Sequence, residues 1–283
     1  MATEKKDNWS TEAYQTSASF VPKLAIKVMQ WLDPQKDDFI LDIGCGDGVL
    51  DLQIAHITSQ GSGGLYGIDS SKAMIEAAKQ KCAGTERCSF QVMDATDLIN
   101  QPSFQKEDFD KVFSNAAMHW ILRPESKREV FFTGVKNALK PGGTFAFEMG
   151  GLGNVSEIRA AIHMAVGRRI GLARVREIDP WFFPDENWVR HIMEERVGGW
   201  KVEQIERQWR PTDADEGGVE GWIRLMAADF FQDFTQEKEK EECIREIVDV
   251  LDEVCKKPAV GGDGNGGGYM FSYVRLRVLA TKL

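Results

Sequence analysis

A glycine-rich turn near residue 45 is the part of this sequence best suited to hold a ligand. The residues LDIGCGDG at 41–48 place Asp42 at the end of an apolar run, with glycines at alternate positions directly after it. Glycine lets the backbone turn sharply, and because it has no Cβ a ligand can lie directly against the main chain. A second apolar run ends in Asp69, at a spacing that suits an acidic residue bonding ribose hydroxyls. Together these residues indicate a nucleoside-binding site.

The spacing of the glycines distinguishes between two classes of nucleoside ligand. Dinucleotide-binding proteins use G-x-G-x-x-G, whereas here Gly46 is followed by Asp47 and Gly48. The carboxylates of Asp42 and Asp47 would also repel a pyrophosphate. The turn therefore favours a ligand that carries an adenosine and a positive charge but no phosphate, and a dinucleotide-dependent dehydrogenase is the weakest of the alternatives.

Alternating strands and helices between residues 39 and 150 are predicted to position these side chains. The short apolar runs with strand character are Phe39–Ile43, Gly64–Ile68, Ser89–Met93, Phe109–Phe113 and Thr144–Phe147. Helical patterns separate them, for example at Ser71–Lys81 and Lys127–Leu139. Such alternation is typical of a parallel sheet with crossover helices, in which ligands bind at the carboxyl ends of the strands.

Outside this block the sequence predicts more helices and two further strands. A polar lead-in and an apolar helix occupy residues 1–38, and helical patterns return at 154–197, 219–234 and 236–256. Strand patterns are found at Trp200–Trp209 and Tyr269–Ala280, and Gly261–Gly268 is predicted to be a loop. We therefore expect a lead-in, then a cofactor-binding core at 39–150, then a region at 151–283 in which helices accompany the last strands of the same sheet.

Between residues 39 and 148 the sequence resembles class I methyltransferases, which use S-adenosylmethionine. The segments that carry the resemblance are LDIGCGDG, YGIDSS around Asp69, QVMDATDL around Asp94 and FSNAAMHW around Asn115. Within that superfamily the chain is similar to the trans-aconitate methyltransferase group. This second resemblance rests on Trp9 and Tyr14, the run GIDSSKAMI, the segment Asn115 to Trp120 and the region PWFFPDENWVRHI.

The resemblance implies a doubly wound, Rossmann-like α/β fold with a seven-stranded, mostly parallel sheet. Its last strand would be antiparallel, and a helical lid insertion would be built from 151–198 and 217–234. The residues implied to hold S-adenosylmethionine are Trp9, Tyr14, Asp42, Gly44, Cys45, Gly46, Asp69, Ser70, Met74, Asp94, Ala95, Asn115 and Ala116. The implied reaction is methyl transfer to a small molecule, in the first instance to the carboxylate of an acidic metabolite.

Residues after the fourth predicted strand are candidates for the acceptor site. His119 could orient an acceptor carboxylate or accept a proton from the acceptor, and the alternative is a histidine that only hydrogen-bonds at the pocket wall. Trp120 is expected to form a wall of the pocket. Arg168 is a candidate to bind an acidic substrate, or it belongs to a solvated helix face. Trp181 and Phe182 either line a pocket for a flat or apolar acceptor or pack the insertion against the sheet.

Composition excludes several other classes of protein. The chain has 283 residues, 42% of them hydrophobic, and no run of 18 apolar residues that would predict a membrane span. Lysine and arginine total 35 against 44 acidic residues, so the net charge of -9 argues against nucleic acid as the main partner. Five cysteines without a C-x-x-C pair indicate neither a disulfide framework nor a metal site, which favours a reducing, cytoplasmic location.

Two other functions stay open at this stage. The first is S- or N-methylation of a secondary metabolite such as a dithiol, which would be favoured if the aromatic segment at 181–188 forms the pocket. The second is a binding or regulatory module that holds the cofactor without methylating a small molecule. The sequence specifies neither the acceptor nor the oligomeric state.

Overall fold

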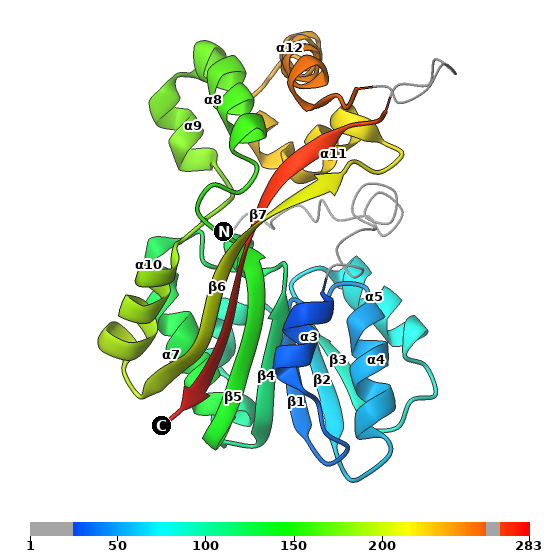
Figure 1. Cartoon of the computed structure of the whole chain (residues 1–283), viewed down its shortest axis with the longest axis vertical. Coiled ribbons are helices and arrows are strands. Elements are labelled where there is room, and N and C mark those ends of the chain that lie inside the picture. Colours follow the sequence, from blue (N-terminus) through cyan, green and yellow to red (C-terminus); the bar gives the residue numbers. More distant parts are fainter. Residues whose placement is uncertain (1–24, 259–266) are drawn as a thin grey trace.

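The computed structural model describes residues 25–258 and 267–283, and a seven-stranded sheet forms its centre (Figure 1). The strands are β1 (Phe39–Ile43), β2 (Gly64–Asp69), β3 (Cys88–Val92), β4 (Phe109–Asn115), β5 (Leu139–Gly150), β6 (Trp200–Asp213) and β7 (Met270–Lys282). Their order is β3-β2-β1-β4-β5-β7-β6. Pairs from β3 to β5 are parallel, and β7 is antiparallel to both β5 and β6. The predicted α/β fold, with its reversed last strand, is confirmed.

Helices cover both faces of this sheet. On one face lie α3 (Ile26–Leu32), α4 (Val49–Thr58) and α5 (Lys72–Lys81), and on the other lie α7 (Arg128–Ala138) and α10 (Glu186–Arg190) (Figure 1). Successive side chains of a strand point to opposite faces of the sheet. Ile40 therefore packs on the face covered by α3 and α4, and Leu41 packs on the face covered by α7. Short helical turns complete the connections: η1 (Ala95–Asn100), η2 (Pro102–Phe104), α6 (Met118–Ile121), η3 (Glu125–Lys127) and η4 (His191–Val197).

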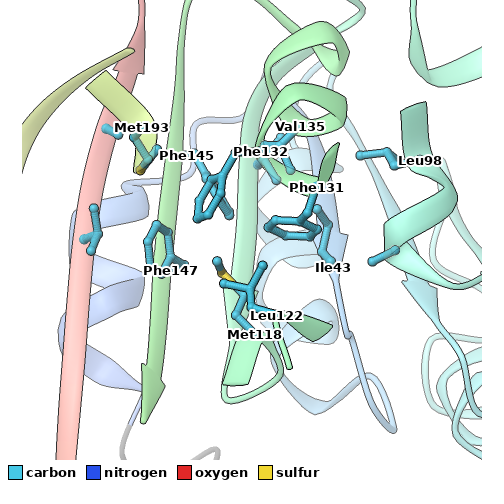
Figure 2. Close-up of a cluster of buried hydrophobic side chains, with 14 of the residues drawn as sticks. Ile43, Leu98, Met118, Leu122, Phe131, Phe132, Val135, Phe145, Phe147 and Met193 are labelled. Carbon is cyan, nitrogen blue, oxygen red and sulfur yellow. The ribbon is translucent and has the colours of Figure 1, made fainter. Parts of the chain in front are cut away.

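Aromatic packing between α7 and the sheet forms the largest apolar cluster (Figure 2). Phe131 and Phe132 on α7 face Phe145 and Phe147 on β5, and all four side chains are fully buried. The ring centroids of Phe132 and Phe147 are 6.3 Å apart, and those of Phe145 and Phe147 are 4.8 Å apart. Rings at such separations stabilise the core beyond the area that they bury. These contacts hold α7 against β5.

A second group of helices packs around the ends of β6 and β7 that extend past the rest of the sheet (Figure 1). This helical cap consists of α8 (Ser156–Ile170), α9 (Leu172–Ile178), α11 (Gly218–Met226), η5 (Ala228–Phe231) and α12 (Glu237–Cys255). Its composition differs from the predicted lid. Residues 186–197 pack on the sheet instead, because Val189, Ile192 and Met193 join the α7 cluster, and α12 takes a place in the cap.

The largest differences from the predicted strand bounds are at the start of β5 and the end of β6. β5 begins at Leu139, before the turn-like residues Pro141 and Gly142, and its pairing with β4 shifts register between Phe109 and Lys111. Proline has no N–H to donate to the ladder, which accounts for an irregular strand start. β6 continues to Asp213 because it stays paired with β7 along its length. Within 25–258 and 267–283, no helix has both the length and the apolarity that a bilayer crossing requires.

Candidate active site

The strand order reverses between β1 and β4, and the candidate site lies at this point. The carboxyl ends of neighbouring parallel strands separate where their connections run in opposite directions, which leaves a crevice for a ligand. Asp42 and Asn115 lie at the carboxyl ends of β1 and β4, and Asp69 ends β2. Hydrogen bonds from the Gly44 and Cys45 amides to the Ile68 carbonyl, of 2.8 and 3.1 Å, join the first turn to β2.

Two glycines in the β1 turn have different physical roles. Gly44 has φ 74°, and a Cβ added there would lie 2.2 Å from Cβ of Ala117, so the turn after β1 touches the turn after β4. Gly46 has φ 58°, but an added Cβ would meet no atom of the described residues within 4 Å. Gly44 is therefore required by internal packing, whereas Gly46 faces open space that a ligand can enter.

Asp69 connects the turn, the second strand and the following helix. Its carboxylate accepts hydrogen bonds from the Gly46 amide at 3.0 Å and from the Ser71 amide at 2.8 Å. These two bonds hold the carboxylate between the glycine turn and the start of α5. Asp69 thus lies where the sequence predicted a ribose-binding carboxylate, beside the open face of Gly46.

A buried pair of carboxyls, Asp42 and Asp51, lies beneath the turn. Asp42 is 2% exposed and Asp51, on α4, is fully buried. Oδ1 of Asp42 and both carboxyl oxygens of Asp51 accept no hydrogen bond from an N–H or hydroxyl of the described residues. Burial, followed by the charges of Asp51 and Asp69, raises the pKa of Asp42 well above its ordinary value. Burial also raises the pKa of Asp51 to about 7. Sequence reasoning missed Asp51, although an acidic residue on the buried face of a helix is an unusual signal.

The remaining cofactor candidates differ in exposure. Cys45 is buried in a small apolar cluster with α5, and burial raises the pKa of its thiol well above the ordinary value, which indicates a packing role. Met74 is buried, and its amide donates to Ser71 Oγ at the start of α5. Ser70 is exposed. Trp9 and Tyr14 lie outside the described residues.

Two candidate segments follow β3 and β4. Asp94 is exposed and its carboxylate accepts from the Thr96 amide at 2.8 Å, while Ala95 is buried. The Met93 amide donates to the Asp69 carbonyl at 2.9 Å, which brings the Asp94 segment beside β2. Asn115 has a buried Oδ1 without a hydrogen-bond donor among the described residues. Ala116 has φ 58°, a strained value for a residue with a Cβ.

These observations favour a nucleoside ligand that carries positive charge. The open face of Gly46 provides space, and the carboxylate of Asp69 provides negative charge beside it. The ammonium of Lys81 is engaged 2.6 Å from Asp47 and so is already neutralised. The residues present therefore fit an adenosine with a cationic group better than they fit a dinucleotide.

A cavity of about 60 Å³, named the acceptor cavity after the role expected for His119 and Trp120, lies between the end of the sheet and the helical cap. Its lining residues are Ala116, His119, Trp120, Asn154, Val155, Trp181, Phe183, Trp222, Met226, Tyr273 and Arg275. Ala116 belongs both to this lining and to the turn that touches Gly44 through Ala117. The acceptor cavity is therefore adjacent to the nucleoside crevice.

His119 is buried at the wall of the acceptor cavity. Its Nδ1 accepts a hydrogen bond from the Gly150 amide at 3.4 Å, an arrangement that places the ring proton on Nε2. Burial, reinforced by the charge of Arg275, lowers the pKa of His119 well below its ordinary value. The imidazole is therefore neutral at physiological pH and can orient an acceptor without carrying charge.

Arg275 brings positive charge to the acceptor cavity. It is 5% exposed, and its Nε donates to Glu148 at 2.9 Å. Arg277 and Arg210 also bond to Glu148, so three guanidinium groups share one buried carboxylate at the end of β5. Burial raises the pKa of Glu148, but the three arginines outweigh it and the net shift is downward. Arg277 also pairs with Glu206 at 2.6 Å, yet the cluster keeps an excess of positive charge.

Two neutral polar groups lie beside Arg275. Oδ1 of Asn154 accepts from the Val274 amide at 2.8 Å, which leaves its NH₂ group as a donor at the cavity wall. The hydroxyl of Tyr273 accepts from Nε1 of Trp222 at 2.7 Å, and burial raises the pKa of Tyr273 to about 12. The hydroxyl therefore stays protonated at neutral pH. Sequence reasoning missed these residues. The signal that could have found them is the strand sequence VRLRVLA, in which two arginines interrupt an apolar run.

Only some of the residues predicted to bind the acceptor line the acceptor cavity. His119, Trp120 and Trp181 line the acceptor cavity. Phe182 points away from it and packs against Arg128, whose guanidinium lies 3.6 Å from the ring centroid, because alternate residues of the extended segment face opposite sides. Phe183 occupies the cavity side instead. Arg168 is exposed on α8 and pairs with Glu246 of α12, so it joins two helices of the cap and does not line the cavity.

Comparison with known proteins finds methyltransferases similar to this chain. A profile of a methyltransferase-domain family matches residues 34–164. The Schizosaccharomyces pombe protein named uncharacterized methyltransferase C70.08c is 34% identical over 98% of this chain and 99% of its own length. Malonyl-[acyl-carrier protein] O-methyltransferase 1 of Ilyobacter polytropus is 26% identical over 53% of each protein. The crystal structure of YcgJ from Bacillus subtilis has a TM-score of 0.59 at 16% identity, over 92% of this chain and 98% of that one.

Proposed function

This chain belongs to the class I S-adenosylmethionine-dependent methyltransferases, and on that premise we propose that it methylates a carboxylate of a small acidic acceptor. The observation that carries the proposal is Arg275, a buried guanidinium group in an aromatic cavity beside the nucleoside crevice. A buried cation of this kind favours an anionic ligand, because charge-assisted hydrogen bonds between a guanidinium and a carboxylate are strong and well oriented.

The nucleoside crevice supports the cofactor assignment. Asp69 would accept the ribose hydroxyls, and the open face of Gly46 would let the main chain approach the methionyl portion. Asp94 and Ala95 would flank the adenine, as the resemblance implies. When bound, S-adenosylmethionine supplies an activated methyl group on a sulfonium, and the neutral thioether that leaves requires no protonation. The negative charge of the Asp69 carboxylate suits that cation.

The residues of the acceptor cavity then have mainly to position the acceptor. An acceptor carboxylate is already nucleophilic and needs no base, which agrees with a neutral His119. Arg275 and the NH₂ group of Asn154 would hold the carboxylate while Trp120 and Trp181 exclude water. Alignment of two reactants can supply on the order of 7–11 kcal/mol of the barrier. The name of the Ilyobacter polytropus relative, an O-methyltransferase of a malonyl group, also supports this acceptor class.

The test is a panel of acceptors. The purified full-length chain is incubated with S-adenosylmethionine and, separately, with trans-aconitate, other small carboxylic acids, a dithiol and an amine. We expect release of S-adenosylhomocysteine only with carboxylic acids, and a methyl ester in the product that mild base hydrolyses. Turnover restricted to the thiol or the amine would reject the carboxylate proposal.

Aromatic walls favour a second candidate. Trp120, Trp181, Phe183 and Trp222 line much of the acceptor cavity, which also suits S- or N-methylation of a flat secondary metabolite. In that case replacing Arg275 would leave turnover of the thiol or amine intact. Cofactor binding without turnover of any acceptor in the panel would instead favour a regulatory or binding module.

A further inference from the structure

Asp42 and Asp51 form a pair of carboxyls that the methyl-transfer reaction does not use. Asp42 is the next-to-last residue of β1, before the glycine turn, and Asp51 projects from the first turn of α4 on the other side of that turn. Both side chains are buried, and Oδ1 of Asp42 and both carboxyl oxygens of Asp51 have no hydrogen-bond donor among the described residues. The charge of Asp51 acts on Asp42, so the two carboxyls are near enough to interact. Two ionised carboxylates buried together without donors would be very costly, so the pair requires a proton.

The groups around the pair strengthen this requirement. Asp69 on β2 and Asp47 in the turn add negative charge, and the ammonium of Lys81 on α5 is bound to Asp47. The other titratable groups packed nearby are the thiols of Cys45, Cys82 and Cys88, and the charge of Asp51 raises the pKa of each. Without a ligand, the charges that act on Asp42 are thus all negative.

We propose that Asp51 of the buried Asp42–Asp51 pair holds a proton in the cofactor-free protein and releases it to solvent when the cationic methionyl end of S-adenosylmethionine binds over the turn. The inference rests on the proposed function, because it needs that cofactor at the nucleoside crevice. The proton leaves the carboxylic acid of Asp51 and produces a carboxylate, so the added positive charge of the ligand replaces the positive charge of the proton. Asp51 is then a positioning residue that need not touch the cofactor.

This linkage has a defined pH dependence. With a pKa of about 7 for Asp51, affinity for S-adenosylmethionine rises about tenfold between pH 6 and pH 8, since below that pKa each pH unit costs a factor of ten. In the Asp51→Asn variant an amide NH₂ would donate to Asp42 and keep it ionised. The affinity of the variant should therefore be nearly independent of pH in the same range.

Isothermal titration calorimetry in buffers of different ionisation enthalpy counts the protons released. At pH 7 we expect release of roughly half a proton for each S-adenosylmethionine bound by the wild type, and close to none in Asp51→Asn. Asp249→Asn is the matched control, since Asp249 is exposed on α12 and should give the wild-type value. Binding without proton release in the wild type, or equal release in Asp51→Asn, would overturn the inference.

Infrared difference spectroscopy gives a second readout that needs no variant. We expect the absorption of a protonated buried carboxyl to disappear when S-adenosylmethionine is added to the wild-type chain. An unchanged carboxylic-acid band in a sample that binds the cofactor would contradict the inference. If the wild type binds no S-adenosylmethionine at any pH, the proposed function itself fails, and the two failures are thereby distinguished.

Discussion

Arg275 is the residue on which the choice of acceptor depends. In Arg275→Met we expect kcat/KM for the carboxylic acid to fall roughly 10- to 100-fold, because a charge-assisted hydrogen bond contributes about 1.5–3 kcal/mol. The affinity for S-adenosylmethionine should change less than twofold, since Arg275 lies in the acceptor cavity. Steady-state kinetics and calorimetry measure the two quantities. Arg168→Met is the control, because Arg168 is exposed and bound to Glu246. Equal losses in both variants would contradict the assignment.

The neutral imidazole of His119 leads to a prediction about how kcat depends on pH. Burial and the charge of Arg275 lower its pKa well below 6.5, so the imidazole is already neutral at pH 6 and stays so as the pH rises. At saturating S-adenosylmethionine, we expect kcat to show no titration of this group between pH 6 and 8. The comparison is between wild type and His119→Gln. An acid limb near pH 6.5 in the wild type that the variant lacks would show that the imidazole titrates during catalysis.

At the scale of single residues, the sequence predicted the groups that follow strands. Asp69 and His119 each come directly after a recognisable apolar run, and a parallel sheet brings such positions to one edge. Arg275 could not be found in this way, because it lies within β7 and reaches the site only through the pairing of β7 with β5. Asn154 was missed for a similar reason, since its position depends on its bond to Val274.

The turn between β1 and α4 contains two glycines with different roles: Gly44 is required for packing, and Gly46 borders the crevice. Gly44→Ala should lower the free energy of unfolding by more than the roughly 1–3 kcal/mol of a strained backbone, because its Cβ would also lie 2.2 Å from Ala117 Cβ. Gly46→Ala has the backbone cost alone and should keep the fold, but its methyl group would enter the crevice and weaken cofactor binding. Chemical denaturation and calorimetry test the pair. Equal stability losses in the two variants would contradict this division.

At the scale of elements, short strands and their crossover helices were well predicted. Phe39–Ile43 matches β1 and Lys72–Lys81 falls within the predicted helix, because apolar runs and helical periodicity are local signals. The cap was predicted less well. Residues 186–197 have the helical pattern of their neighbours, and only the tertiary contacts of Val189 and Met193 assign them to the sheet.

For the molecule as a whole, the buried carboxyl pair predicts how stability depends on pH. Folding raises the pKa of Asp51 from 3.8 to about 7, so its contribution to stability is fully present at low pH and is lost as the pH rises through 7. We expect the cofactor-free wild type to lose stability between about pH 5 and pH 7.5 relative to Asp51→Asn. Urea unfolding at several pH values measures this. A difference between the two proteins that is the same at every pH would contradict it.

The whole-molecule fold was predictable because the alternation of strands and helices indicates a parallel sheet with crossover helices, and the family resemblance implies seven strands with the last one reversed. The position of the acceptor cavity was not, since its walls come from β7, from the cap and from the turn after β4, which are distant in sequence. Only the folded chain shows that Ala116 joins the nucleoside crevice to the acceptor cavity.

A crystal structure with S-adenosylhomocysteine and a carboxylic acid acceptor tests the central claim most directly. The account predicts the ribose hydroxyls on Asp69, the sulfur directed past Ala116 into the acceptor cavity, and the acceptor carboxylate on the guanidinium of Arg275. A product bound elsewhere, or an acceptor carboxylate that lies away from Arg275, would contradict it.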